Sequence, residues 1–543
     1  MKLESGRLTP EIIDEYTRAG IWTDRAIIDV LESQATAFPE RTALVDARGR
    51  MTYGEYFAAA QRIATRFVEL GLSRDDVIAV QLPNWKEFAL VVAGAMLAGI
   101  PFCQFHSDFR SKEVEFILGF MEASTIVCPQ SFRGFDYGPM IDEMRPRLPR
   151  LRHVLMVGDD VPPEAIDLRA LVSDPAAPVD AAALRSRRPR GNDLLRVAFT
   201  SGTTGDPKAV QHTSNTTMTA CRICNRIQLL DAEGATLIFL PVGLNWGLFL
   251  IIEAILAGCK AVLLERFDAG EVLRLIETER ISHFAAAPAS IIALLDHPEI
   301  ETRDVGSLRV YVTGGASCPV EVIERAERAI SARLLEMYGM LETGTTAQTL
   351  VEDDPRRVVG LVGMPIPEVP MRILDDEGHA VPPGTVGEIA NRGPSVMIGY
   401  YNNPAANERA FTPEGWFKTG DLGVIDADGY LKIVGRKKEM IIRAGANVYP
   451  REIEEVLFKH PAVADGAVIG VPHPRTGEQV VACVVLRPGT QLSFEDLVAF
   501  LAPQIAKYKL PERLEILPAL PRTPTGKVQK DRLVERVAGE VAR

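Results

Sequence analysis

The sequence predicts an α/β fold, with a large N-terminal domain followed by a small α+β domain. Before about residue 355, apolar runs with the length of buried strands alternate with helix-length segments, an order typical of βαβ units and a parallel sheet. Beyond that point, short apolar runs are separated by Gly and Pro, which indicates β structure with turns. A chain of 543 residues is also too long for one hydrophobic core, so we expect at least two domains.

The first layer of the large domain contains alternating strands and helices. Thr52 and Glu55 have the spacing of a capping box, and the apolar residues that follow recur at helical intervals, which predicts an amphipathic helix over residues 56–70. Asn84 begins a second helix that Gly99 ends. The remaining predicted elements are a helix over 111–123 and strands over 77–82, 100–105 and 125–128.

A second layer, a β-rich part and the small domain follow. Residues 162–192 lack a clear pattern and are interpreted as surface helix and linker, with the arginines of 185–190 on a solvated face rather than in a phosphate patch. The later predictions are strands over 236–240, 260–264, 282–286, 466–471 and 480–486, helices over 247–257, 269–278 and 450–458, and a helix capped by Ser493 with Asp496. Residues 1–435 therefore form a large domain of two βα-layered subdomains plus a β-rich subdomain, and residues 436–543 form the small α+β domain.

Composition restricts the class of protein. The formal net charge of -12 argues against a nucleic-acid binder that depends on an overall basic surface. Seven cysteines are few for this length and favour reduced thiols in the cytoplasm, with the Cys221 and Cys224 pair structural rather than part of a zinc site. The N-terminus has no signal-like apolar run, and stretches such as 88–97 are too short to span a bilayer. We expect a cytoplasmic protein without a membrane segment, and no particular oligomeric state is predicted.

The most informative stretch runs from Thr200 to Lys208. Five glycine and hydroxyl residues in a row cannot pack a core, yet they follow the apolar run 194–199 and precede a lysine. Glycines bring backbone N–H groups close to phosphate oxygens, hydroxyls add donors, and the lysine adds positive charge, so an anion-binding loop is favoured over a flexible linker. Pro207 separates the last glycine from Lys208, an order different from that of the P-loop. The five residues are Ser201, Gly202, Thr203, Thr204 and Gly205.

This loop resembles the phosphate loop of the adenylate-forming enzymes, the superfamily of acyl- and aryl-CoA ligases, peptide-synthetase adenylation domains and luciferases. Further stretches resemble that superfamily's motifs in the same order, so the resemblance covers nearly the whole chain. They are Tyr338-Gly339-Met340-Leu341-Glu342, Trp416-Phe417-Lys418-Thr419-Gly420-Asp421, Gly435-Arg436-Lys437-Lys438 and Pro521-Arg522-Thr523-Pro524-Thr525-Gly526-Lys527.

The resemblance implies roles around a bound nucleotide. Tyr338, with Gly339 beside it, is expected to pack on adenine, and Glu342 is expected to hold Mg²⁺. Asp421 is expected to accept hydrogen bonds from both ribose hydroxyls, which suits a carboxylate with two oxygens, and Arg436 also meets the nucleotide. Leu341 stands where the superfamily has threonine, with Thr343 close by. Gly314, Gly315 and Ala316 resemble the segment that edges the adenine and the acyl group.

The C-terminal part is expected to be mobile and to carry a catalytic lysine. By resemblance Lys527 bridges the carboxylate and the α-phosphate, and a cation there relieves the repulsion between two anions as they meet. Lys438 occupies the hinge position between the two domains. Arg443 and Gly445 lie in a segment resembling that of CoA ligases, which the small domain presents to the thiol after it has turned.

The acid pocket is expected around the segment 241–247. Leu244 replaces a histidine or aromatic residue of the superfamily, Trp246 adds an apolar wall, and Asn245 resembles an asparagine that aryl-acid-activating members use to contact the acid. Asn245 is equally explained as a cap at the end of a strand. His212 either lines the acid site or is a satisfied histidine at a helix entry, and Gly315 borders the same region.

Together these observations predict a two-step ligase. ATP and a carboxylic acid give an acyl-adenylate and pyrophosphate with Mg²⁺, Thr200 and Lys208, and coenzyme A then takes the acyl group with release of AMP. The acid is predicted to be medium-chain, alicyclic or aromatic. The alternatives are an adenylation enzyme that loads a carrier protein and a silent nucleotide-binding sensor, which Leu341 and Leu244 favour.

Overall fold

The computed structural model describes residues 7–174, 178–200, 207–315, 318, 320–354, 360–522 and 527–541. The chain divides into two compact units, of which the first comprises the residues up to Thr200, 208–370 and 392–409, and the second comprises 371–391 and the residues from 410 onward. The predicted boundary after residue 435 falls inside the second unit, and movement about that point remains a prediction.

The first unit contains a large, mainly parallel sheet. In the described part of the chain its strand order is β18-β17-β16-β15-β14-β12-β13-β1-β2. Strands β1, β13, β12, β14, β15 and β16 are parallel, and antiparallel strands close both edges. The strands are β1 (Thr42–Asp46), β2 (Gly49–Thr52), β12 (Ala235–Ile238), β13 (Lys260–Leu263), β14 (His283–Ala286), β15 (Val310–Gly314), β16 (Arg333–Met340), β17 (Gly344–Gln348) and β18 (Met364–Pro365).

A second sheet in the same unit has the order β21-β11-β10-β4-β3-β5-β8-β9. Strands β3, β4 and β5 are parallel neighbours, as the alternating pattern predicts. The short strand β11 runs antiparallel to β10 and was not predicted, because a strand that follows a Gly and hydroxyl loop has no helix-length spacer before it. The strands are β3 (Ile78–Val80), β4 (Phe102–Gln104), β5 (Thr125–Pro129), β8 (His153–Val157), β9 (Ile166–Asp167), β10 (Leu194–Phe199), β11 (Ala209–Thr213) and β21 (Gly399–Tyr400); β6 (Ser131–Phe132) pairs with β7 (Phe135–Asp136) beside it.

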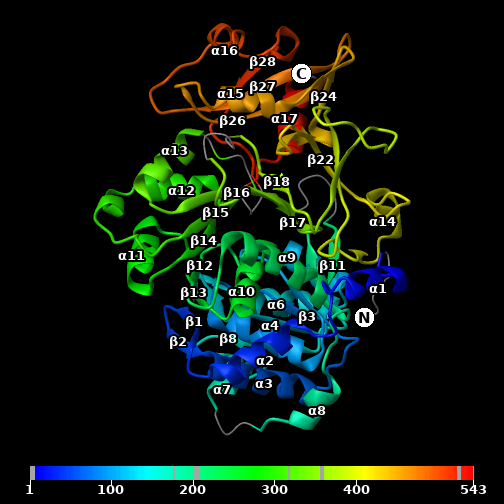
Figure 1. The fold of residues 1–543 in the computed structure, drawn as a ribbon, viewed down its shortest axis with the longest axis vertical. Coiled ribbons are helices and arrows are strands. Elements are labelled where there is room, and N and C mark those ends of the chain that lie inside the picture. The colour runs from blue at the N-terminus through cyan, green and yellow to red at the C-terminus, as the bar shows by residue number, and fades with distance from the viewer. Residues whose placement is uncertain are drawn as a thin grey trace. The chain divides into compact units, whose positions relative to one another are not determined.

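Helices cover and connect these two sheets. Helix α9 contacts both β11 and β17, so it lies between the sheets, and α10 packs on α9 and on β12 (Figure 1). Helices α11, α12 and α13 contribute to a hydrophobic core that includes Leu237, Val262 and Tyr311. The helices are α1 (Pro10–Arg18), α2 (Ile27–Ala37), α3 (Tyr53–Glu69), α4 (Lys86–Ala98), α5 (Ser111–Phe120), α6 (Tyr137–Met144), α7 (Leu168–Ser173), α8 (Ala181–Ser186), α9 (Ser214–Gln228), α10 (Asn245–Ala257), α11 (Ala269–Glu279), α12 (Pro288–Leu295) and α13 (Val320–Ala329).

Local helix signals in the sequence are confirmed. Thr52 accepts the backbone N–H of Glu55, whose carboxylate accepts the N–H of Thr52, so the capping box begins α3 as predicted. Gly99 adopts a left-handed conformation and ends α4.

Arg188 forms ion pairs with Asp29 and Glu32, which agrees with a surface role for its arginine-rich segment.

The second unit holds two sheets. One has the order β19-β20-β22-β23, and the other has β25-β24-β27-β26 with β28 alongside β27. Ser493 caps α16 as predicted. The strands are β19 (Met371–Leu374), β20 (Gly387–Asn391), β22 (Phe417–Ile425), β23 (Leu431–Arg436), β24 (Ile441–Arg443), β25 (Ala446–Val448), β26 (Val463–His473), β27 (Gly477–Leu486) and β28 (Arg513–Ile516), and the helices are α15 (Pro450–Leu457), α16 (Phe494–Leu501) and α17 (Lys530–Val541). Helix α14 (Pro404–Ala410) follows β21.

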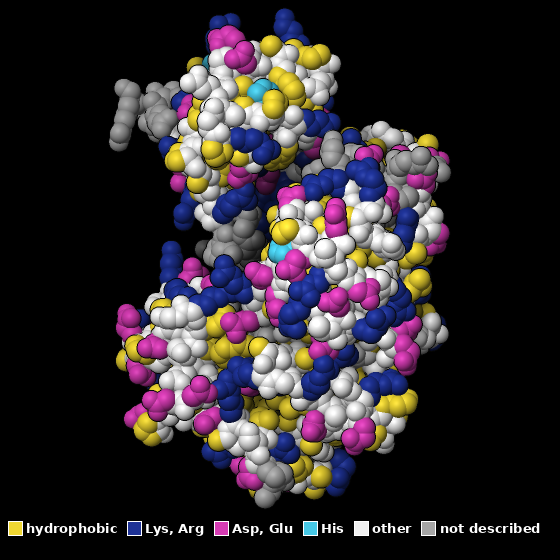
Figure 2. All heavy atoms as spheres, turned by 90° about the vertical axis from the view of Figure 1, so that its left-hand side faces the viewer, with side chains coloured by type: hydrophobic (Ala, Val, Ile, Leu, Met, Phe, Trp, Pro, Cys, Tyr) yellow, Lys and Arg dark blue, Asp and Glu magenta, His cyan; other side chains and the backbone are white. Residues whose placement is uncertain are grey.

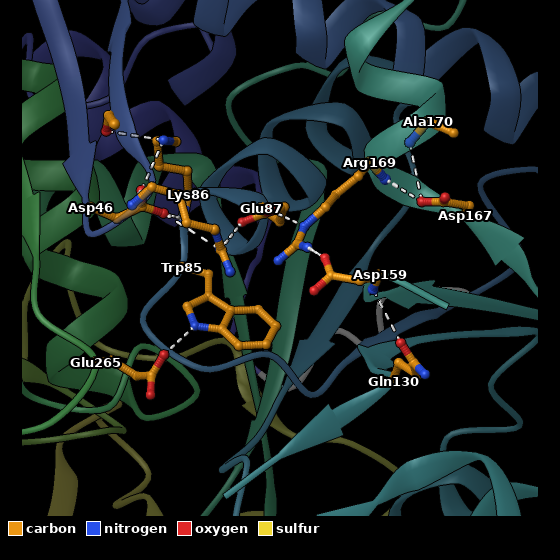
Figure 3. A network of polar contacts seen from close by, with 12 residues as sticks. Asp46, Trp85, Lys86, Glu87, Gln130, Asp159, Asp167, Arg169, Ala170 and Glu265 are labelled. Atoms are coloured by element: carbon orange, nitrogen blue, oxygen red, sulfur yellow. Dashed lines mark hydrogen bonds and ion pairs between the residues drawn. The ribbon is translucent and has the colours of Figure 1, made fainter. Parts of the chain in front are cut away.

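A polar network joins the sheets of the first unit around the start of α4 (Figure 3). Lys86 pairs with Asp46 at the end of β1, with 2.8 Å between Nζ and Oδ1. Glu87 accepts hydrogen bonds from Arg48 and from Arg169 on α7. Because several partners share each charge and Glu87 is buried, this network fixes α4 between the two sheets.

The surface is of mixed charge. On the face that Figure 2 shows, Lys and Arg side chains are interspersed with Asp and Glu. All seven cysteines are unpaired and buried. In the part of the chain that the structure describes, no helix has the length and apolar character needed to cross a bilayer.

Candidate active site

The predicted phosphate loop is closed by a pair of backbone and side-chain hydrogen bonds at its ends. Thr200 donates its backbone N–H to the carbonyl of Lys208 at 3.0 Å, and Lys208 donates its own N–H to the Thr200 hydroxyl at 3.1 Å. These bonds extend the antiparallel pairing of β10 and β11, so both ends of the loop have fixed positions. The five residues Ser201, Gly202, Thr203, Thr204 and Gly205 lie outside the described residues.

A tyrosine brings Lys208 and Glu342 together. Tyr400 on β21 donates its hydroxyl to Glu342 Oε1 at 3.0 Å, and the Lys208 ammonium lies 4.8 Å from the centre of the same ring. Strand β21 pairs with β11, which places Tyr400 opposite Val210, two residues from Lys208. Tyr400 is buried, and burial followed by the Glu342 carboxylate raises the pKa of its phenol, so the tyrosine remains a hydrogen-bond donor. Sequence reasoning missed Tyr400, and only its pairing with β11 identifies it.

His212 connects β11 to the Tyr338–Glu342 motif. Its Nε2 lies 2.7 Å from the backbone oxygen of Leu341, and its Nδ1 lies 3.1 Å from the Thr216 hydroxyl. Burial, with a smaller contribution from the positive charge of Arg196, lowers the pKa of His212 to about 3, so the imidazole is neutral at pH 7. Both ring nitrogens have partners within the protein, as expected of a satisfied histidine, and the ring face is what remains to border a ligand.

The turn after Tyr338 is tightly packed. Gly339 lies opposite Thr345, and a Cβ at this glycine would be 2.4 Å from the oxygen of Gly344, so no larger residue fits without a shift. The Thr343 hydroxyl is buried and donates to the Gly344 oxygen at 2.9 Å. Thr343 is therefore occupied within the protein rather than replacing the missing threonine at Leu341.

Asn84 fixes the segment that leads into the expected acid pocket. Its side-chain amide donates to the oxygens of Ile238, Leu240 and Leu264, and its Oδ1 accepts the backbone N–H of Val242. Since Asn84 precedes α4, this buried side chain couples the strand ends of one sheet to a loop of the other. A Cβ on the next residue, Gly243, would lie 2.2 Å from the oxygen of Phe105.

Helix α10 begins at Asn245, with Leu244 as its N-cap residue and no side-chain capping bond. The alternative that Asn245 is itself the cap is therefore wrong. Leu244, Asn245 and Trp246 are all half-buried, which leaves part of each side chain accessible. A Cβ on Gly314 at the end of β15 would lie 3.4 Å from the Trp246 ring, so the two predicted pocket segments adjoin. Gly315 is exposed, and Ala316 lies outside the described residues.

Arg196 on β10 is a further polar residue here that sequence reasoning missed. Its guanidinium is fully buried and donates from Nη2 to Asn245 Oδ1 at 2.6 Å. The guanidinium carbon lies 5.3 Å from the centre of the Phe249 ring. Arg196 pairs in register with His212, so the two side chains lie on the same face of neighbouring strands. No sequence motif identifies Arg196, but a charged residue within an apolar strand is unusual and could have indicated a functional residue.

In the second unit, the predicted ribose residue and Arg436 are cross-strand partners. Asp421 on β22 lies opposite Arg436 on β23, with 3.3 Å between the Arg436 Nε and the carboxylate. Asp421 is buried, and its backbone N–H donates to the Thr419 hydroxyl. The neighbouring Lys437 pairs with Glu388, whereas Lys438 is exposed within the short 3₁₀ turn Lys437–Glu439.

The turn that carries Lys527 is anchored on both sides. Gln529 donates its N–H to the Pro521 oxygen at 2.8 Å, and Arg522 pairs with Asp465 on β26. Lys530, at the start of α17, pairs with Glu454 at 2.8 Å and with Glu439 at 3.1 Å. Lys527 itself is exposed, and residues 523–526 lie outside the described residues. Its backbone position is thus tied to the same segment that contains Lys438.

The segment expected to face the thiol is a tight hairpin between β24 and β25. Ala444 and Gly445 both have positive φ, 50° and 82°, which matches a two-residue hairpin turn. Arg443 donates to the Tyr508 oxygen at 2.7 Å and pairs with Glu512 at 2.8 Å. Gly445 is exposed at the tip, while the guanidinium of Arg443 is held against the protein.

Comparison with known proteins gives the class to which this architecture belongs. The AMP-binding enzyme family matches residues 31–401, and the AMP-binding enzyme C-terminal domain matches residues 452–527. The chain belongs to the AMP-binding enzyme family.

Particular relatives narrow that class. The chain is 35% identical over 535 residues to a 2-hydroxy-7-methoxy-5-methyl-1-naphthoate–CoA ligase of Streptomyces carzinostaticus, covering 96% of this chain and 95% of that protein. It is 33% identical to a salicylyl-CoA synthase / salicylate adenylyltransferase of a Streptomyces species, covering 98% and 97%. The structure of ATP-bound MatB from Rhodopseudomonas palustris superposes with a TM-score of 0.82 at 28% identity, covering 94% and 99%.

These relatives confirm the predicted superfamily, the mixed α/β fold and the enzyme class. The protein is an acid–thiol ligase that activates a carboxylic acid with ATP, forms AMP and transfers the acyl group to coenzyme A.

We expect His212 to make the first unit less stable in acid. Its pKa of about 3 lies below the ordinary 6.5, so the unfolded chain takes up the proton as the pH falls below 6.5 while the folded chain does not. At pH 5 this difference corresponds to about 2 kcal/mol of lost stability. Urea unfolding at pH 7.5 and 5.0 should show a smaller acid loss for His212→Gln than for the wild type. An equal loss in both proteins would show that His212 is protonated in the fold.

Proposed function

We propose that the protein joins a medium-chain, alicyclic or aromatic carboxylic acid to coenzyme A through an acyl-adenylate. The observation that carries this proposal is the arrangement of Lys208, Tyr400 and Glu342, because it places a cation and a carboxylate beside the closed ends of a glycine and hydroxyl loop. A cation is needed where phosphate oxygens gather, and a carboxylate is needed where a hard metal ion shares those oxygens.

Mg²⁺ fits the chemistry of this end of the site. Glu342 is buried, and one of its oxygens accepts from Tyr400, an interaction that orients the carboxylate. Among the described residues no group of three His, Cys, Asp or Glu side chains could hold a metal ion. Mg²⁺ commonly uses only one or two carboxylates together with substrate phosphates. Bound there, it would neutralise charge on the triphosphate.

The nucleotide's other contacts are proposed for two places. In the first unit, Tyr338 and the segment Gly314–Gly315 would border the adenine, and the space beside Gly315 is open because a Cβ there would meet no atom of the described residues within 4 Å. In the second unit, Asp421 would accept from the ribose hydroxyls, and Arg436 beside it would keep that carboxylate ionised and oriented.

We assign Lys527 to the first half-reaction only. Its ammonium would bridge the incoming carboxylate and the α-phosphate, and rotation about Lys438 would then withdraw it and present the hairpin at Gly445 to the thiol. The ion pairs of Lys530 with Glu439 and Glu454 support this coupling, because they tie the Lys527 turn to the segment that contains Lys438.

The half-buried, mostly apolar surroundings of the pocket segment favour an acid larger than acetate. Leu244 and Trp246 are apolar and partly accessible, while Asn245 provides a polar group. Two of the relatives are named for aromatic acids with a hydroxyl next to the carboxyl group, a naphthoate and salicylate, and an aromatic acid of that kind is consistent with these side chains. We further propose a cytoplasmic protein.

Lys527→Ala should abolish acid-dependent exchange of labelled pyrophosphate into ATP, because the two anions would meet without a bridging cation. The same variant should still convert a supplied acyl-adenylate and coenzyme A to the thioester. Lys459→Ala removes another exposed lysine of the same unit and should leave both reactions unchanged. Unchanged exchange in Lys527→Ala would remove the assignment.

Lys438→Pro should spare adenylation and lower thioester formation by about a hundredfold or more, since proline fixes φ near the value that the present 3₁₀ turn uses. Lys438→Ala, which leaves the backbone free to rotate, is the matched control and should retain both steps. Single-turnover assays of each half-reaction measure the effect. An equal loss of both steps in the proline variant would count against a hinge at this residue.

Tyr400→Phe should raise the Mg²⁺ concentration needed for half-maximal exchange and lower the exchange rate by about tenfold, because the Glu342 carboxylate loses the hydroxyl that orients it. The ring beside Lys208 remains. Tyr56→Phe makes the same chemical change in a buried tyrosine that donates to Ala89, and should not alter the Mg²⁺ dependence. Wild-type Mg²⁺ dependence in Tyr400→Phe would contradict the proposal that Tyr400 orients Glu342 as a metal ligand.

Two further readings of the sequence are separable by the same assays. A nucleotide-binding sensor gives no acid-dependent pyrophosphate exchange. An enzyme that loads a carrier protein gives exchange but forms no thioester with free coenzyme A. We place both behind the coenzyme A ligase because two of the relatives that cover almost the whole chain are named for coenzyme A products.

A further inference from the structure

Arg196 is the one fully buried guanidinium of the described residues that borders the proposed acid pocket and lacks an acidic partner. Its side chain is 0% exposed, and no Asp or Glu forms an ion pair with it among the described residues. Two of its nitrogens, Nε and Nη1, have no hydrogen-bond partner. Burying a charge without an acidic partner costs several kcal/mol, which favours a functional role for Arg196.

The single side-chain hydrogen bond of Arg196 fixes the orientation of an amide. A guanidinium has only donors, so the atom of Asn245 that it contacts at 2.6 Å must be the acceptor, Oδ1. The two ends of an asparagine amide differ only in hydrogen bonding, and here a neighbour without acceptors decides between them. The Asn245 Nδ2 group is therefore directed away from Arg196.

That Nδ2 group is left to meet a ligand. It forms no hydrogen bond with any described residue, and the Asn245 side chain is only half-buried. Trp246 and Leu244, the neighbours on either side, are half-buried as well. A molecule that contacts this segment therefore meets two N–H donors from Asn245 and no acceptor.

The positive charge of Arg196 also favours an acceptor atom on the ligand. Burial lowers the pKa of Arg196 to about 10, and smaller effects of Cys221 and Cys103 oppose this shift, so the group stays protonated at pH 7. Its register partner His212 is neutral and does not compete for an acceptor. In surroundings of low polarity this cation strengthens any hydrogen bond from Asn245 to an electron-rich oxygen.

We propose that Arg196 is a positioning residue that sets acid specificity, by holding the Asn245 amide so that the site prefers carboxylic acids whose body carries an acceptor oxygen over those that carry a donor. Suitable oxygens are those of an ether, a carbonyl, or a phenol whose own proton is bonded to the neighbouring carboxylate. The inference rests on the proposed function in that it takes Asn245 to face the acid.

The test compares acids of one shape. Benzoic acid and its 2-, 3- and 4-methoxy and 2-, 3- and 4-amino derivatives are assayed with ATP, Mg²⁺, coenzyme A and the full-length protein, and kcat/KM is measured from AMP release. At the ring position that reaches Asn245, we expect kcat/KM for the methoxybenzoic acid to exceed that for the aminobenzoic acid by about a hundredfold. The amino group would leave the N–H donors of Asn245 buried without an acceptor.

Three variants separate positioning from a structural role. Arg196→Met should bring the methoxy-to-amino ratio to within about threefold of one, because the amide is then free to turn, and Arg196→Lys should restore part of the ratio because lysine also donates. Asn245→Asp has nearly the same shape but only acceptors, and should reverse the preference. Arg62→Met removes a partly buried arginine on α3 and should leave the ratio unchanged.

Each outcome decides the proposal. The proposal is contradicted if Arg196→Met lowers kcat/KM equally for all acids and retains the methoxy-to-amino ratio. It is also contradicted if the Asn245→Asp protein still prefers the methoxybenzoic acid. If Arg196→Met does not fold, as judged by thermal melting, the Asn245→Asp and Arg196→Lys ratios decide. If none of these acids supports AMP release by the wild type, the proposed function is contradicted instead. Dissociation constants of the same acids, measured by calorimetry, then give the methoxy-to-amino ratios.

Discussion

The antiparallel pairing of β11 with β10 on one side and with β21 on the other is the constraint on which the phosphate end of the site depends. Its register places Lys208 at one end of the glycine and hydroxyl loop and Tyr400 beside it, and Tyr400 in turn contacts Glu342. A shift of one residue would turn every side chain of β11 to the opposite face. Lys208, His212 and their partners would then no longer meet.

Buried polar groups mark this region of the first unit. Arg196, His212 and Glu342 are each almost fully buried, and each is held by a specific partner, namely Asn245, Leu341 and Tyr400. Such groups are costly in an interior, and proteins retain them mainly where binding or catalysis requires a fixed dipole or charge. Within the second unit, the buried Asp421 is paired with Arg436 on the adjacent strand.

Much of the architecture was readable from the sequence, because local rules and long-range order agree there. The capping box at Thr52, the glycine at the end of α4 and the alternation of strands and helices all predicted the observed elements. The order of the motifs predicted the family. What the sequence did not reveal depends on pairing between distant strands, such as β11 with β21, which joins Tyr400 to a loop about two hundred residues earlier.

Single residues of the site show the same limit. Asn245 was ambiguous between cap and ligand contact, and only the start of α10 at this residue resolved its backbone role. Arg196 lies in an apolar run that reads as an ordinary buried strand, so neither its partner nor its burial could be inferred. Lys527 and Lys438 were named by resemblance, whereas the ion pairs of Lys530 that connect their segments emerge only from the fold.

The most direct test of the central claim follows an oxygen atom. With the carboxylate of a turned-over acid labelled with ¹⁸O, the account predicts that one labelled oxygen appears in AMP, because the carboxylate oxygen bonds to the α-phosphorus and stays there when the thiol takes the acyl carbon. Mass spectrometry of the AMP measures this. AMP that carries no label while the thioester accumulates would contradict an acyl-adenylate.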